Sequence, residues 1–108
     1  MEQIEQLIEA IDRGDYSTNT LPDNEVCVSC STSRIFAIVQ YDSYKSEYDD
    51  SFRHEFGIHT VVVRKTEYEM LSFHLEDEEG GEVVFNKDQF SRLELSLKQV
   101  MIDLETTE

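Results

Sequence analysis

The chain has 108 residues, of which 39% are hydrophobic and 10% aromatic, which is enough for one folded domain with a modest core. Twenty-four acidic residues against nine basic ones give a formal net charge of −15, which repels nucleic acids and anionic membranes and favours partners with basic surfaces. Since no apolar run approaches the length of a membrane span, we expect a soluble, cytoplasmic protein.

The first predicted element is an amphipathic helix from Met1 to Arg13, followed by Gly14 where a C-terminal cap belongs. Its apolar face consists of Ile4, Leu7, Ile8 and Ile11. Its acidic residues form a second stripe, which we expect on the opposite face: Glu2, Glu5, Glu9 and Asp12. With a rise of about 1.5 Å per residue, this stripe spans roughly 15 Å. It therefore presents a row of negative charge comparable to a row of backbone phosphates.

The next segment, Asp15 to Glu25, is polar, contains Pro22 and is predicted to be a loop. Two strands follow, Val26 to Ser31 and Ile35 to Tyr41, and the serines and threonines between them predict a hairpin. The second strand is apolar on both faces, which places it in the middle of a sheet.

The segment from Asp42 to Phe56 has an aromatic residue at every fourth position from residue 44 onward. This spacing is compatible with a helix capped by Ser43, but several of its residues are poor helix formers, and a long ordered loop is the alternative. Acidic residues alternate with the tyrosines, and the pattern includes Tyr44, Tyr48, Asp49 and Asp50.

Three further strands are predicted before the end of the chain. Ile58 to Lys65 and Tyr68 to Leu75 are rich in β-branched or alternating apolar residues. The acidic turn from Glu76 to Gly81, which includes Glu78 and Glu79, leads to a short strand from Val83 to Phe85.

The final predicted element is a helix that starts with a capping box formed by Asn86 and Gln89 and runs to Leu104. Leu95 and Ile102 lie away from its main apolar face and would provide the contact of a homodimer. The fold class predicted for residues 1–108 is one α+β domain. It has an antiparallel sheet of about five strands, with the N- and C-terminal helices packed on one face.

Candidate chemistry is sparse. Cys27 and Cys30 have the spacing of a zinc knuckle, and His54 and His59 would complete four ligands of a metal-binding domain. The alternating strand directs the two cysteines to opposite faces, however, so we interpret them as semi-buried thiols and predict no metal site. The two histidines are five residues apart rather than four, so they do not form the metalloprotease helix motif. We find no catalytic motif and predict a non-enzymatic protein without a cofactor.

The first sixteen residues carry one resemblance. The pattern of Ile4, Leu7, Ile8 and Ile11 followed by Asp15 and Tyr16 resembles the opening of small, acidic, phage-borne anti-CRISPR proteins. The resemblance covers the first helix only. It implies an αβ protein without catalysis that acts in the host cell cytoplasm. Such a protein would mimic DNA and occupy the DNA- or PAM-binding surface of an RNA-guided nuclease.

We therefore expect an acidic inhibitor that binds a basic, nucleic-acid-binding surface of a host-defence or DNA-processing protein by nucleic-acid mimicry. The alternative is an acidic structural, assembly or adaptor subunit. Electrostatic steering would bring the partners together, and a smaller set of side chains would then form the contact. The candidate partner-binding residues are Glu5, Glu9, Asp12, Tyr44, Tyr48, Asp49, Asp50, Glu78 and Glu79.

Overall fold

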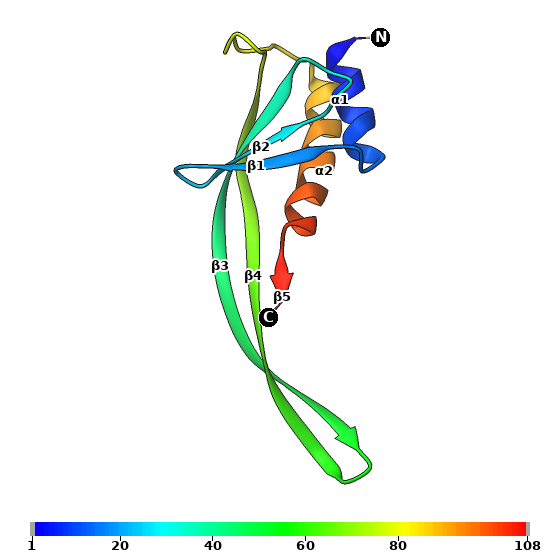
Figure 1. Cartoon of the computed structure of the whole chain (residues 1–108), viewed down its shortest axis with the longest axis vertical. Helices are drawn as coiled ribbons and strands as arrows, with labels where there is room; N and C mark the ends of the chain where they lie inside the picture. The colour runs from blue at the N-terminus through cyan, green and yellow to red at the C-terminus, as the bar shows by residue number, and fades with distance from the viewer. Residues whose placement is uncertain (1, 108) are drawn as a thin grey trace.

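The computed structural model describes residues 2–107, which form one small α+β domain with an antiparallel sheet and two helices (Figure 1). The elements in chain order are α1 (Gln3–Asp12), β1 (Ser17–Leu21), β2 (Glu25–Ser29), β3 (Phe36–His54), β4 (Gly57–Glu76), α2 (Lys87–Asp103) and β5 (Thr106–Thr107). The strands lie in the order β1-β2-β3-β4-β5, and both helices cover the same side of the sheet. The predicted fold class is confirmed at this level.

The hydrophobic core lies between the two helices and the part of the sheet formed by β2, the start of β3 and the end of β4. Leu7 and Ile8 of α1 are almost fully buried, as is Leu97 of α2. The strands contribute alternate residues, because successive side chains of a strand point to opposite faces of the sheet. The core residues of the strands are Val26 and Val28 of β2, Ala37 and Val39 of β3, and Leu75 of β4.

The start of α2 has the capping box predicted from the sequence. The Asn86 side chain accepts a hydrogen bond from the backbone N–H of Gln89 at 2.8 Å, and the Gln89 side chain accepts one from the backbone N–H of Asn86 at 3.0 Å. Two amides that have no partner within the helix are thereby satisfied. Phe90 in the first turn stacks on Phe73 of β4, with 5.1 Å between the ring centroids, so the capped end also docks on the sheet.

The prediction of a loop from Asp15 to Glu25 is wrong, because Ser17–Leu21 forms β1 and pairs with β2. Most of β1 is exposed, so its sequence has no apolar alternation by which a strand is usually detected. The turn that follows places Asp23 and Asn24 in the left-handed region, with φ of 62° and 57°. These are residue types that tolerate this conformation.

The predictions for residues 42–75 are also wrong in two respects. Asp42 to Phe56 is neither a helix nor a loop, since β3 continues to His54, and the two strands expected between Ile58 and Leu75 are one strand, β4. Four residues is a multiple of the two-residue period of a strand, so aromatic residues at every fourth position lie on one face of β3. The spacing that was compatible with a helix is equally compatible with a strand.

The expected strand from Val83 to Phe85 does not form. The chain here makes one isolated bridge between Glu76 and Glu82, and the Val83 N–H donates to the Leu75 carbonyl at 3.0 Å. Gly80, with φ of 82°, allows the preceding acidic turn to close. Pairing ends here because the chain turns into the cap of α2.

The long β3–β4 hairpin gives the molecule its shape, with extents of 60 × 28 × 24 Å. Its register shifts between Gln40 and Tyr41, and from there the two strands leave the body of the protein as a twisted ribbon (Figure 1). We call residues 42–69 the arm and the remaining described residues the body.

The cap of α2 is open to a direct test. Replacing Asn86 with alanine removes the side-chain acceptor for the Gln89 N–H, and we expect the free energy of unfolding to fall by about 1 kcal/mol. Urea denaturation followed by circular dichroism measures this change. Asn86→Asp keeps an acceptor at the same position, so an equal loss of stability in that variant would contradict the assignment.

Candidate protein-binding surface

The arm has two faces, because residues that lie directly opposite each other in an antiparallel pair share a face. The observed register pairs Asp42 with Glu69, Tyr44 with Glu67, Tyr48 with Val63 and Asp50 with Val61. One face therefore gathers tyrosines and carboxylates from both strands. We call it the tyrosine face and define it by Asp42, Tyr44, Tyr48, Asp50, Glu67 and Glu69.

The tyrosine face is exposed and partly ordered by its own hydrogen bonds. Tyr44 and Tyr48 are 47% and 53% exposed. The Tyr44 hydroxyl donates to Glu69 at 2.8 Å and lies 3.5 Å from an oxygen of Asp42. The hydrogen bond to Glu69 is the main cause that raises the pKa of Tyr44, so the phenol stays neutral beside the two carboxylates. The result is a flat, hydrogen-bonding aromatic surface with negative charge at its margin.

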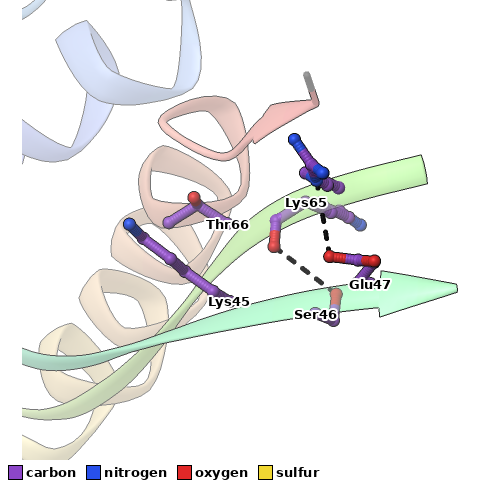
Figure 2. Close-up of a pocket in the computed structure, with 6 residues that line it drawn as sticks. Lys45, Ser46, Glu47, Lys65 and Thr66 are labelled. Carbon is purple, nitrogen blue, oxygen red and sulfur yellow. Dashed lines mark hydrogen bonds and ion pairs between the residues drawn. The ribbon is translucent and has the colours of Figure 1, made fainter. Parts of the chain in front are cut away.

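One cation lies on this face, and its charge is compensated. Lys65 Nζ is 3.3 Å from Glu67 and 3.4 Å from Glu105, and these two carboxylates raise its pKa. Figure 2 shows the hollow beside Lys65, which Lys45 and Thr66 also line. Because Lys65 is the cation of this face, the carboxylates of the tyrosine face outnumber its positive charge.

The opposite face of the arm has a different character. Glu47 pairs with Arg64 at 3.4 Å, and Ser51 contacts Thr60 at 3.0 Å. Asp49 lies on this face, since it is adjacent in sequence to Asp50 and successive residues of a strand alternate. The structure thus separates two candidate residues that the sequence placed together.

The acidic stripe of α1 does not form the outward row that was expected, and that expectation is wrong for Glu5 and Asp12. Glu5 is 2.8 Å from Arg92 of α2, and Asp12 accepts a hydrogen bond from Ser96. Both carboxylates flank the apolar stripe and join α1 to α2 rather than facing away from it. Glu9 lies 4.0 Å from Arg13 on the exposed side of the helix.

The turn that contains Glu78 and Glu79 lies at the end of the molecule remote from the tip of the arm (Figure 1). Asp77 organises this turn by accepting from the backbone N–H groups of Glu79 and Gly81 at 2.9 and 2.8 Å. The candidate residues therefore fall into three separate places: α1, the arm and this turn. Of these three places, the arm is the one that brings candidate tyrosines and carboxylates together.

Three members of the tyrosine face were not among the sequence candidates: Asp42, Glu67 and Glu69. The two glutamates come from β4, and their position beside Tyr44 depends on the register of the long hairpin. The signal that would have found them is the two-residue period of the aromatic positions. Interpreting Asp42 to Phe56 as a strand places Glu67 and Glu69 opposite it.

The two cysteines lie on different faces of the sheet, as predicted. Cys30 packs against the hydrophobic core, whereas Cys27 alternates with the core residues Val26 and Val28 and lies on the other face. Both thiols are free. Among residues 2–107, no group of three or more His, Cys, Asp or Glu side chains is arranged to hold a metal ion.

Comparison with known proteins found no family model, no curated protein and no solved structure that matches the chain. Within residues 2–107, neither helix combines the length and the hydrophobicity that crossing a bilayer requires.

The environment of Cys27 makes a prediction about its reactivity. Burial is the main cause that raises the pKa of the Cys27 thiol above its ordinary value of 9.0, and the charge of Glu76 adds to it. Because the thiolate is the reactive form, we expect iodoacetamide to label Cys27 more slowly in the folded protein than in urea, at every pH below 9. Since ionisation is easier in the unfolded chain, the ionisation of Cys27 lowers the free energy of unfolding as the pH rises above 9. Mass spectrometry of the Cys27 peptide measures the labelling, and equal rates in the two states would contradict the assignment.

Proposed function

We propose that this is a non-enzymatic binding protein that docks the tyrosine face of its arm on a basic surface of a partner protein. The observation that carries the proposal is the gathering of Tyr44 and Tyr48 with four carboxylates on one exposed face of the arm. Exposed tyrosines supply rigid contact area at a small cost in conformational entropy. Apart from the contact between Lys65 and Glu105, the body leaves this face open, so it is available for docking.

The partner surface that fits is one that normally binds nucleic acid. Strand residues rise about 3.4 Å each, so the carboxylates from Asp42 to Asp50 extend over roughly 27 Å. A narrow acidic ribbon of this length complements a channel lined with lysine and arginine. Such an inhibitor acts by excluding the nucleic acid, and the net charge of −15 accelerates its encounter with the channel.

Host-defence and DNA-processing proteins supply targets of this kind. An RNA-guided nuclease holds its heteroduplex in a positively charged channel, which is the surface that the anti-CRISPR resemblance of the first helix implies. In our proposal the contact with such a channel is made by the arm. Glu5 and Asp12 of α1 serve instead to hold the two helices together.

Neighbouring residues on opposite faces of β3 provide a matched test. We expect Asp50→Asn, alone or with Tyr48→Ala, to reduce capture of nucleic-acid-binding proteins from a lysate by several-fold. Asp49→Asn makes the same change of charge one residue away, on the other face, and should leave capture unchanged. Quantitative mass spectrometry of pull-downs with the immobilised protein makes the comparison.

Salt and competition complete this test. Raising the salt from about 0.1 M to about 1 M shortens the Debye length from about 10 Å to about 3 Å and should release the captured proteins. Added nucleic acid should release them as well, because both ligands occupy one surface. Equal losses in the Asp49→Asn and Asp50→Asn variants, or capture that nucleic acid does not disturb, would count against the proposal.

A second candidate function is that of a structural or assembly subunit that dimerises through α2. The observation in its favour is that Leu95 and Ile102 are 71% and 55% exposed, although both are large apolar residues. They lie seven residues apart on α2 and form a small ridge on one side of that helix.

The assembly candidate predicts that replacing both Leu95 and Ile102 with glutamine lowers the mass in solution from that of a dimer to 12.6 kDa. Light scattering coupled to gel filtration measures the mass. Lys98→Gln changes an exposed residue between them and serves as the control. An unchanged mass in the double variant would remove this candidate.

A further inference from the structure

The two outer edges of the arm differ sharply in charge. The part of β3 within the arm carries charged residues along its length: Asp42, Lys45, Glu47, Asp49, Asp50 and Arg53. β4 carries none from Gly57 to Val63. Charged side chains along an edge strand discourage another strand from pairing with it. The β3 edge is guarded in this way, and the β4 edge is not.

The unguarded edge has defined limits. It begins at the hairpin turn before Gly57 and ends where β5 pairs with Lys65 and Thr66. Between these limits, no strand within residues 2–107 pairs with the outer side of β4. Ile58 and Val62 on this stretch are 74% and 50% exposed. A two-stranded ribbon with an open apolar edge is marginally stable in water, so pairing with a further strand would stabilise it.

The charge distribution indicates which strand pairs there. From Lys45 to Thr66 the two paired strands have four basic and four acidic residues, so this outer part of the arm is neutral overall and the rest of the chain carries the whole negative excess. Two copies that meet elsewhere bring carboxylates against carboxylates. Two copies that meet at the tips of their arms do not, and their acidic bodies stay at opposite ends of the assembly (Figure 1).

We propose that the β4 edge from Gly57 to Val63 pairs antiparallel with the same edge of a second copy, giving a four-stranded ribbon with a two-fold axis at Thr60. The uncharged segment is centred on this residue, so the axis aligns Ile58 of each copy with Val62 of the other. The contact is isologous and closes on itself.

The proposed dimer is independent of the function proposed above and compatible with it. Edge pairing uses backbone groups and leaves both faces of the ribbon uncovered. A two-fold axis perpendicular to the ribbon keeps the two tyrosine faces on the same side. The dimer would thus present two docking surfaces to a partner with repeated sites, which raises the effective affinity without any new contact.

The first test is the mass of the full-length chain and its matched variants in sedimentation equilibrium. We expect the wild-type chain to have twice its monomer mass of 12.6 kDa. Val62→Lys places a charge on the open edge and should give the monomer. Ser51→Lys adds the same charge on β3 of the same ribbon and should leave the dimer intact. Circular dichroism confirms that both variants fold.

Salt separates this dimer from the binding function. Screening the repulsion between two chains of net charge −15 should strengthen the dimer as salt rises, whereas binding to a basic partner should weaken. Asp50→Asn should leave the dimer mass unchanged, so either proposal can fail without the other.

Crosslinking tests the register. In a background in which Cys27 and Cys30 are replaced by serine, Thr60→Cys places two thiols beside the two-fold axis and within disulfide range. We expect a covalent dimer on mild oxidation. Ser51→Cys, directly opposite Thr60 on β3, should give none. A monomeric wild-type chain, a Val62→Lys variant that keeps the dimer mass, or equal crosslinking at both positions would each overturn the proposal.

Discussion

The structure depends on one constraint: a two-stranded ribbon cannot bury either of its faces. The shared core is complete where β2, β3 and β4 meet the two helices, and it ends near Tyr41 and Tyr68, whose rings contact edge to face at 5.1 Å. Beyond that pair, no helix or further strand among residues 2–107 covers either face of the ribbon (Figure 1). Most side chains of the arm beyond this pair are thus exposed to water or available to another molecule, which is why the arm holds the candidate surfaces.

The same constraint determines how far the fold could be predicted from the sequence. α1, α2 and β2 bury one face each, so their apolar residues recur with the period of the element, and all three were predicted. β1 and the arm bury neither face, and an exposed strand need not alternate. The tyrosines at every fourth position fit a helix and a strand equally, and only pairing across the hairpin distinguishes the two. The tyrosine face was missed in part for the same reason, because two of its six residues come from β4.

The sequence predicts the amount of negative charge, but not which carboxylates form contacts within the fold. The sequence shows an excess of acids on α1, and its periodicity places them in one stripe. It does not show that two of those carboxylates accept hydrogen bonds from Arg92 and Ser96, which lie on a helix more than eighty residues later. Such partly exposed contacts contribute little stability individually, but they orient α1 on α2. Part of the negative charge is thereby used within the fold, and the remaining carboxylates are the ones available to a partner.

The two proposed contact surfaces of the arm, the tyrosine face and the β4 edge, face different directions. Side chains of a strand stand perpendicular to the sheet, whereas its backbone hydrogen bonds lie within the sheet. A partner on the tyrosine face and a second copy on the β4 edge therefore approach along different axes. The charges separate in part, since Asp42, Glu67 and Glu69 lie toward the body, and Asp50, which lies opposite Val61, is carried by β3 and not by the open edge of β4. A ribbon built in this way can display the same acidic face twice without bringing two acidic bodies together.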